Sequence, residues 1–441
     1  MLRLAGPLVL AELGWMSMAI VDTIMVGRLP ASAEAIGAVS LGSILFFTVG
    51  IFGGGLLLGL DTLVSQAFGA GDVEDCHRSL LDSTYLCLVL APFLMGILWL
   101  CMSFLGQLRV HPAILRGAIP YLHALIWGTF PLLLYFALRR YLQAMNLVKP
   151  VTFALITANL VNLVGNWILI YGRLGAPAMG VAGSGWATSL SRIYMGLVLL
   201  GYILYYEHRH KTGLTKTSLQ PDLVRIRRLV GLGFPAAMQL SLEVAVFATA
   251  TALIAKLDPV SLAAHQIALN TVSFTYMVPL GISSAAAVRV GQALGRKDAR
   301  AASRSGWTAL MLGGGFMFCA ALALLLVPGR IARIYTPDLA VLRTSASLLL
   351  VAAFFQLFDG LQAVATGALR GTGDTRTPML SHLVGYWMVG LPLGYFLCYR
   401  LRWGAIGLWA GLCVALILIG LVLLGAWHKK VRALARATAG P

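Results

Sequence analysis

Long apolar segments alternate with short polar or Gly/Pro-rich breaks along the whole chain. Each segment has the roughly 20 apolar residues that a helix needs to cross a bilayer, and many could span it at a tilt. The apolar runs are continuous and lack the period-two alternation of a membrane barrel. We therefore predict twelve membrane-spanning helices, over 5–27, 36–62, 80–106, 115–138, 150–171, 179–206, 229–257, 261–288, 306–328, 340–368, 377–400 and 403–427.

The composition agrees with this pattern. Hydrophobic residues make up 59% of the chain and charged residues only 11%, whereas a soluble domain has about 25% charged residues. The expected fold class is therefore an all-α integral membrane protein that lies in a lipid bilayer.

The formal net charge of +17 changes the picture less than its size suggests. When alternate connections are assigned to one side of the membrane, starting from the N-terminus, 22 of the 33 Lys and Arg residues fall on that side. The positive-inside rule then places both termini in the cytoplasm. We interpret the basic residues as a topology signal and a surface for anionic lipid headgroups, and we expect no nucleic-acid partner.

The chain contains an internal repeat. The segment Gln66–Asp72 (QAFGAGD) returns at an offset of 226 as Gln292–Asp298 (QALGRKD). Two pairs of prolines follow at an offset of 228: Pro7 with Pro235, and Pro150 with Pro378. Several matches at a nearly constant offset indicate a duplication.

Each copy of the repeat contains six predicted helices, and an even number preserves orientation. The halves should therefore be parallel repeats related by an axis along the membrane normal. We predict an N-lobe over 1–206, a polar cytoplasmic linker over 207–224 and a C-lobe over 225–441. Two such lobes are expected to enclose a central cavity with a binding site near the midplane.

Four acids lie deep inside predicted membrane helices: Glu12, Asp22, Glu243 and Asp359. A charged side chain at the bilayer centre costs at least roughly 2.5–3.5 kcal/mol, so such residues are usually paired or functional. Asp61 and Asp82 lie closer to the helix ends, where we expect water to reach them. Arg192 is the only basic residue that we place at depth.

The segment 150–171 offers partners for these acids. Asn162 and Asn166 are four residues apart and therefore on one helix face, and Asn159 lies a turn earlier. Their amides can donate to a carboxylate or contribute oxygen to a cation. The alternative is that they only join helices through hydrogen bonds.

The duplication did not copy the acids. At an offset of 228, Asp22 corresponds to Ala250 and Glu243 corresponds to Trp15. This asymmetry favours a specialised role for each lobe. An acid of this kind can load and release a proton, or two carboxylates with nearby amide oxygens can hold a hard cation.

The whole chain resembles the multidrug and toxic compound extrusion (MATE) transporters, in particular their NorM-like branch. The motifs that carry the resemblance span almost the full length: Val21–Gly27, Ser65–Gly69, Asn162–Gly172, Ala263–Gln266, Val290–Gly295 and Leu369–Asp374.

The resemblance implies a secondary active antiporter, and not an enzyme, in the bacterial cytoplasmic membrane. It would export amphiphilic cationic drugs by alternating access in exchange for Na⁺ or H⁺, as a monomer and without any other cofactor. The resemblance leaves the choice between Na⁺ and H⁺ open.

The resemblance also implies two sites. The N-lobe site would consist of Asp22, Asn162, Asn166 and, on the sixth helix, Thr188. Some members have an aspartate in place of Asn166, and the amide here suits shared hydrogen bonding or sodium coordination. The C-lobe site would consist of Glu243 and Asp359, which would be the Na⁺ ligands of a sodium-coupled protein. The family has no role for Glu12, which we interpret as a buried, hydrogen-bonded acid.

His265 has two readings, a pH switch or a buried histidine with satisfied hydrogen bonds, and we favour the second. The chain has no Gly-x-x-x-x-Gly-Lys-Ser/Thr phosphate loop, so the energy should come from an ion gradient and not from ATP.

Two alternative functions make different demands on the sequence. A lipid-linked oligosaccharide flippase of the same superfamily would need a strongly basic cavity for pyrophosphate, and only Arg192 is deep. A membrane-embedded lipid transferase would need Asp-x-x-x-Asp metal–diphosphate motifs at a membrane face, and the sequence has none.

Overall fold

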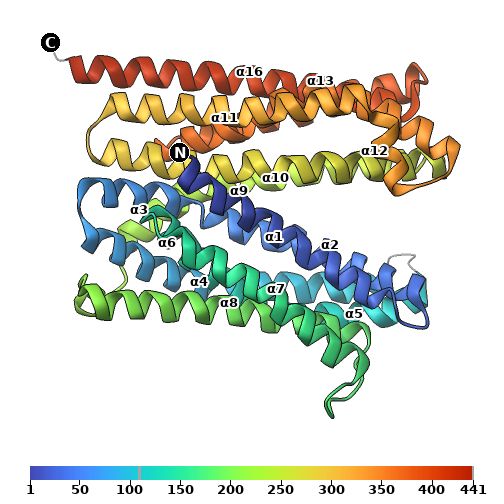
Figure 1. Ribbon diagram of the computed structural model, residues 1–441, viewed down its shortest axis with the longest axis horizontal. Coiled ribbons are helices and arrows are strands. Elements are labelled where there is room, and N and C mark those ends of the chain that lie inside the picture. The colour runs from blue at the N-terminus through green and yellow to red at the C-terminus, as the bar shows by residue number, and fades with distance from the viewer. Residues whose placement is uncertain (108–110, 440–441) are drawn as a thin grey trace. The chain divides into compact units, whose positions relative to one another are not determined.

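The computed structural model describes residues 1–107 and 111–439, and these residues form helices without any strand (Figure 1). The α-helices are α1 (Leu2–Val26), α2 (Ser32–Leu56), α3 (Gly59–Ala70), α4 (Val73–Phe104), α5 (Pro112–Trp127), α6 (Thr129–Ala144), α7 (Val148–Tyr171), α8 (Val181–His210), α9 (Leu223–Ile254), α10 (Pro259–Gly295), α11 (Ala299–Leu326), α12 (Pro328–Tyr335), α13 (Leu339–Gly371), α14 (Arg376–His382), α15 (Leu391–Tyr395) and α16 (Gly404–Ala439). Two short 3₁₀ turns, η1 (Leu105–Gln107) and η2 (Leu214–Lys216), and two π-helical stretches, η3 (Leu383–Gly390) and η4 (Phe396–Arg400), complete the described elements.

The predicted all-α membrane fold is confirmed. Within the described residues, 11 helical segments are long and apolar enough to cross a membrane, and a bent pair raises the number to 12. That pair is α5 with α6, which meet at 46° and correspond to the predicted segment 115–138. Its break lies at Gly128, where a Cβ would stand 2.6 Å from Ser189 Oγ of α8. A larger residue at this break would therefore press against side chains of α8.

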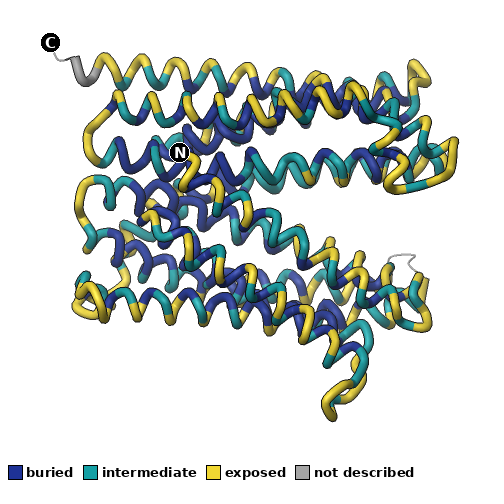
Figure 2. The backbone as a smooth tube through the Cα atoms, in the orientation of Figure 1, coloured by how far each residue is buried: buried dark blue, intermediate teal, exposed yellow. Residues whose placement is uncertain are grey.

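The described chain divides into two compact units. We call Leu10–Ala237 the N-unit, and Met1–Val9 with Met238–Pro441 the C-unit. In the N-unit, one contiguous apolar cluster extends from Ala11 to Ala237. Figure 2 shows exposed residues along the helices of both units. Many of them are large and apolar, which is expected of helices that face lipid.

Helices α1 and α9 each pass from one unit to the other, at equivalent points of the repeat. The boundary falls after Val9 in α1 and after Ala237 in α9, two positions that correspond at the same offset as the proline pairs. A Cβ on Gly281 of α10 would lie 2.7 Å from the backbone nitrogen of Val9, and one on Gly55 of α2 would lie 2.5 Å from Ala237 Cα. Two equivalent glycines thus allow close backbone approach inside each unit, of Val9 to α10 within the C-unit and of Ala237 to α2 within the N-unit.

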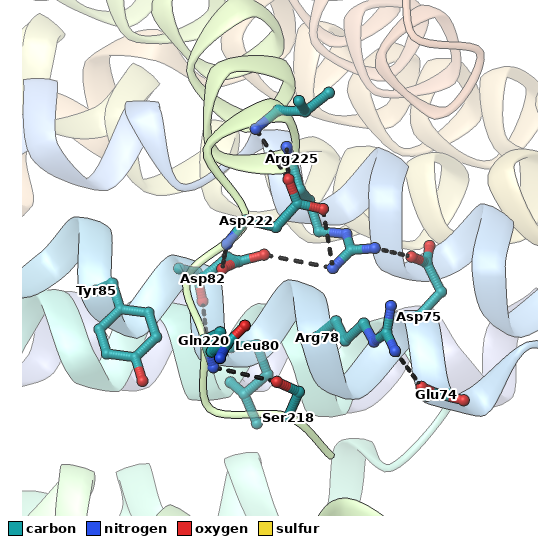
Figure 3. A network of polar contacts seen from close by, with 12 residues as sticks. Glu74, Asp75, Arg78, Leu80, Asp82, Tyr85, Ser218, Gln220, Asp222 and Arg225 are labelled. Atoms are coloured by element: carbon teal, nitrogen blue, oxygen red, sulfur yellow. Dashed lines mark hydrogen bonds and ion pairs between the residues drawn. The ribbon is translucent and has the colours of Figure 1, made fainter.

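The polar linker is fastened to the N-unit (Figure 3). Arg225, at the start of α9, donates to Asp75 Oδ1 over 2.7 Å and to Asp82 Oδ2 over 3.4 Å, both on α4. Asp82 Oδ1 also accepts from the backbone nitrogen of Asp222 over 3.0 Å. Tyr85 donates to the carbonyl of Leu219 over 2.5 Å. The end of the linker and the start of α9 are therefore held against α4 by hydrogen bonds and ion pairs.

The expectation that water reaches Asp61 and Asp82 is wrong. Their residues are only 1% and 3% exposed, respectively. Arg140 lies 3.5 Å from Asp61, and Arg225 pairs with Asp82. Both acids are enclosed because a basic residue of another element lies against each of them, a partnership that hydropathy does not reveal.

Candidate functional site

The four residues of the predicted N-lobe site form one buried hydrogen-bonded ring. Asn166 Nδ2 donates to Asp22 Oδ1 over 2.6 Å, and Thr188 Oγ1 donates to Asp22 Oδ2 over 2.8 Å. Asn166 Nδ2 also donates to Asn162 Oδ1 over 3.1 Å, and Asn162 Nδ2 donates to Thr188 Oγ1 over 3.4 Å. No member is more than 7% exposed. We call these residues the Asp22 ring.

Close packing of α7 against α8 brings the ring together. Gly172 ends α7 in the left-handed conformation, with φ +67°, and turns the chain back toward α8. A Cβ on Gly183 of α8 would lie 2.5 Å from the carbonyl oxygen of Leu169, so only glycine fits there. The asparagines of α7 consequently lie within hydrogen-bonding distance of Thr188.

A second set of bonds fixes α1, which carries Asp22, to α7. Ser17 donates to Asn159 Oδ1 over 2.9 Å, and Asn159 Nδ2 donates to the carbonyl of Gly14 over 3.0 Å. Tyr171 donates to the carbonyl of Met25 over 2.6 Å. Asn159 therefore helps to hold α1 in place beside α7. Its hydrogen bonds to α1 go to Ser17 and Gly14, not to Asp22.

The hydrogen bonds of the ring suit Asp22 in its ionised form. Both oxygens of Asp22 accept from neutral donors, which is the arrangement that suits an ionised carboxylate. Asn166 Oδ1 is buried and has no hydrogen-bond partner among the described residues. One acceptor beside the carboxylate is thus left over for a proton donor or a cation.

The C-lobe acids lie in a different environment. Glu243 of α9 and Asp359 of α13 are both in the C-unit, and their side chains are close enough for their charges to interact. Gln362 Nε2 donates to Asp359 Oδ1 over a long 3.3 Å. Two buried oxygen atoms among these residues, Glu243 Oε2 and Gln362 Oε1, have no hydrogen-bond partner among the described residues. We call the two acids with Gln362 the Glu243–Asp359 cluster.

Unpaired oxygens of this kind fit a hard cation. Carboxylate and amide oxygens are the ligands that such ions prefer, and two carboxylates in one buried site repel each other unless a proton or a cation lies between them. The chemistry of the cluster therefore suits the binding of a proton or a hard cation better than the binding of an anion.

His382 of α14 is a member of this region that sequence reasoning missed. Its Nδ1 lies 2.8 Å from the carbonyl of Pro378, to which it donates, and its Nε2 lies 3.7 Å from Glu243 Oε2. Its ring is fully buried. The sequence carried no signal for this contact, because His382 is far from Glu243 along the chain and belongs to no motif.

Glu12 also has a partner, which corrects the expectation that only Arg192 provides a deep positive charge. Arg139 Nη2 donates to Glu12 Oε1 in a buried ion pair. The hydropathy pattern places Arg139 in a connection between spans, but it lies in α6, before the last turn of that helix. The predicted interpretation of Glu12 as a buried, hydrogen-bonded acid is confirmed, and continuing the apolar periodicity through Leu138, Tyr141 and Leu142 would have found the partner.

Arg192 is buried, as predicted, and lies on α8 one turn after Thr188. Its guanidinium carbon is 4.2 Å from the centre of the Phe46 ring on α2. Its Nε and Nη1 atoms have no hydrogen-bond partner among the described residues. The contact with Phe46 is a cation–π interaction.

His265 is held as a neutral ring. Trp409 Nε1 can only donate, and it lies 2.9 Å from His265 Nδ1, which must accept. Thr251 Oγ1 donates to the carbonyl of Phe247 and lies 2.8 Å from His265 Nε2, so that it accepts the remaining ring proton. Both ring nitrogens are satisfied, which favours the buried-histidine reading.

Carboxylates buried inside the spanning helices of a duplicated bundle are features of a secondary membrane transporter. The MatE family profile matches residues 7–168 and 235–396, two matches whose starting points reproduce the offset of the proline pairs and confirm the repeat. The chain belongs to the MatE family and is a transporter, not an enzyme.

Among its relatives are proteins of similar length. The chain is 36% identical over 98% of its length to a probable multidrug resistance protein NorM of Mesorhizobium japonicum, 93% of which is covered. It is 35% identical over 94% of its length to the multidrug resistance protein PmpM of Pseudomonas aeruginosa, with 88% covered. The NorM-like resemblance is therefore confirmed.

Solved structures show the same fold. A crystal structure of the eukaryotic MATE transporter AtDTX14 superimposes with a TM-score of 0.88 at 20% identity and covers 99% of this chain and 97% of its own. A MATE crystal structure in the bent conformation gives 0.90 at 18% identity, with 100% and 96% covered.

Proposed function

We propose that this protein is a secondary active multidrug efflux transporter that exports amphiphilic cationic compounds in exchange for Na⁺ or H⁺ by alternating access. The names of its relatives, among them the multidrug resistance proteins NorM and PmpM, support drugs as the cargo. The protein acts in the bacterial cytoplasmic membrane as a monomer, with both termini in the cytoplasm, and needs no cofactor beyond the coupling ion.

The observation that carries the proposal is the presence of two separate groups of buried carboxylates inside membrane helices. Asp22, held by Asn166 and Thr188, couples the ion to the drug. Glu243 and Asp359 form a second ion site in the C-lobe. Deep acids also suit a cationic cargo, since an amphiphilic cation and a coupling cation can compete for the same negative charge.

Alternating access then follows from unequal affinities. An ion shifts the equilibrium between two conformations only if it binds one of them more tightly. In the proposed cycle, the outward-facing protein takes up the ion and releases the drug. After return to the cytoplasmic side, the ion leaves and a new drug molecule binds.

The test is transport in proteoliposomes that hold ethidium, with a Na⁺ gradient or a pH gradient imposed separately. One of the two gradients should drive ethidium movement well above the rate without a gradient, and its identity settles the coupling ion. Ethidium movement that depends on neither gradient, or transport of a lipid-linked sugar in its place, would contradict the proposal.

A further inference from the structure

Helix α12 departs from the internal repeat. It lies between α11 and α13, and at an offset of 226 its middle corresponds to the single turn η1 of the N-unit. Where the N-unit has that turn of three residues, the C-unit has an eight-residue helix with the sequence PGRIARIY. The duplication therefore does not account for α12, and its side chains need their own explanation.

The helix has an inner and an outer face. Ala332 is fully buried and Ile331 is half-buried against the C-unit, while Tyr335 lies 3.5 Å from Thr271 Oγ1 of α10. Arg330, Arg333 and Ile334 lie three and four residues apart on the opposite face and are exposed. Ile334 is 81% exposed.

The ends of the two neighbouring spanning helices are also exposed and apolar. Leu326 ends the spanning helix α11 and Leu339 begins the spanning helix α13, and they are 77% and 64% exposed. Because α12 connects the ends of two candidate membrane spans, we expect it at the level of the lipid headgroups. We call Leu326, Arg330, Arg333, Ile334 and Leu339 the α12 surface.

No described acid neutralises the two arginines. Neither Arg330 nor Arg333 has a carboxylate of the described residues within ion-pair distance. Asp338, the acid closest to them in sequence, instead caps α13 by accepting from the backbone nitrogens of Ala340 and Val341 over 2.8 and 3.2 Å. Two cations beside exposed aliphatic side chains at a membrane boundary are complementary to a phosphate joined to acyl chains.

We propose that the α12 surface binds an anionic phospholipid, with the headgroup phosphate on Arg330 and Arg333 and an acyl chain against Ile334, Leu326 and Leu339. Guanidinium groups recognise phosphate through paired hydrogen bonds, and a glutamine side chain retains hydrogen bonding but not the charge. The site is independent of the ion and drug sites, so it stands whether or not the proposed transport function is right.

The test is native mass spectrometry of the full chain, purified in a neutral detergent and titrated with phosphatidylglycerol or with phosphatidylcholine. The wild type should bind phosphatidylglycerol more tightly than phosphatidylcholine. R330Q/R333Q should weaken phosphatidylglycerol binding roughly tenfold or more, as expected from about 1 kcal/mol for each basic residue near an anionic surface. R330K/R333K, which keeps the charge, should recover most of the loss.

The matched control is R173Q/R400Q, which removes two exposed arginines that have no ion-pair partner among the described residues and lie on the same predicted side of the membrane. It should leave the preference for phosphatidylglycerol unchanged. The proposal is overturned if R330Q/R333Q binds phosphatidylglycerol as tightly as the wild type, or if the control loses as much, which would mean that only the net charge matters.

Discussion

The Asp22 ring and the Glu243–Asp359 cluster both place carboxylates inside membrane helices, but they differ in the hydrogen bonds that these carboxylates receive. Asp22 receives a hydrogen bond on each oxygen, over 2.6 and 2.8 Å. In the cluster, Glu243 Oε2 and Gln362 Oε1 have no hydrogen-bond donor among the described residues. The Asp22 ring gives its carboxylate two short hydrogen bonds, whereas the cluster leaves carboxylate and amide oxygens without a donor, which suits a cation or a proton.

The repeat explains how two such different sites arise on one scaffold. At the offset of the proline pairs, Asn162 and Asn166 of α7 correspond to Gly390 and Gly394. These glycines pack closely against α16, where a Cβ on Gly390 would lie 2.6 Å from Ala415 Cβ. The C-unit thus packs helices closely at the two positions where the N-unit has hydrogen-bonding asparagines. The surroundings of the acids therefore differ between the two units.

The largest expected effect is on stability and concerns a third buried acid, Glu12. Its variants test whether a buried carboxylate is enough to make a coupling site. R139Q removes its buried partner and should destabilise the protein by about 3–5 kcal/mol, because an unpaired charge is left inside. Thermal unfolding of the purified protein measures this loss.

The matched variant is E12Q/R139Q, which removes both charges and should recover most of the stability together with ion-coupled efflux. If this folded double variant loses ion-coupled efflux, Glu12 is itself needed for coupling. It would then be a third coupling acid beside the Asp22 ring and the Glu243–Asp359 cluster.

An intermediate effect is expected from E243Q/D359N, which removes the negative charge of the cluster but leaves the Asp22 ring intact. An ion that binds the folded protein stabilises it by about 2.7 kcal/mol at a concentration 100 times its Kd. The Tm of the wild type should therefore rise with the coupling ion, and the double variant, which keeps only the Asp22 ring, should lose most of this rise.

The control for this measurement is E34Q, which neutralises an exposed acid at the start of α2 and should keep the full rise in Tm. If E243Q/D359N keeps the rise and D22N loses it, the assignment of the two sites is reversed.

The smallest effect is expected from T188V, which removes one of the two donors to Asp22 while preserving the shape of the side chain. A hydrogen bond to a charged group contributes about 1.5–3 kcal/mol, so ion-coupled ethidium efflux should fall about tenfold or more. Initial rates in proteoliposomes measure this change.

T157V is the matched control, since the Thr157 hydroxyl only donates to carbonyls of its own helix, and its rate should stay within about twofold of the wild type. Equal losses in both variants would show that the hydroxyl of Thr188 has no special role at Asp22.

Much of the fold could be predicted from the sequence because a bilayer imposes a strong rule on every spanning segment. Long apolar runs indicated the spans, and the offset between matching motifs indicated the repeat. What failed was the depth of charged residues near helix ends. Arg139, Asp61 and Asp82 looked accessible because an isolated helix end meets water, and only tertiary contacts bury them.

The members of the two candidate sites were predictable to different degrees, because contacts between distant helices leave no local pattern in the sequence. The Asp22 ring joins α1, α7 and α8. Asp22, Asn162 and Asn166 stand in motifs or at helical spacing, whereas Thr188 could be named only through the family resemblance. His382 reaches Glu243 from another helix without a motif, and the π-helical stretch that follows it is set by packing against α16. No local pattern could have predicted that contact.

The most direct test of the central claim is gradient-driven ethidium transport by D22N in proteoliposomes, beside D258N as the control. Asp258 is an exposed acid that caps α10, a role that asparagine fills equally well. The account predicts that D22N inserts normally but loses gradient-driven transport, while D258N keeps it. Full gradient-driven transport by D22N would contradict the account.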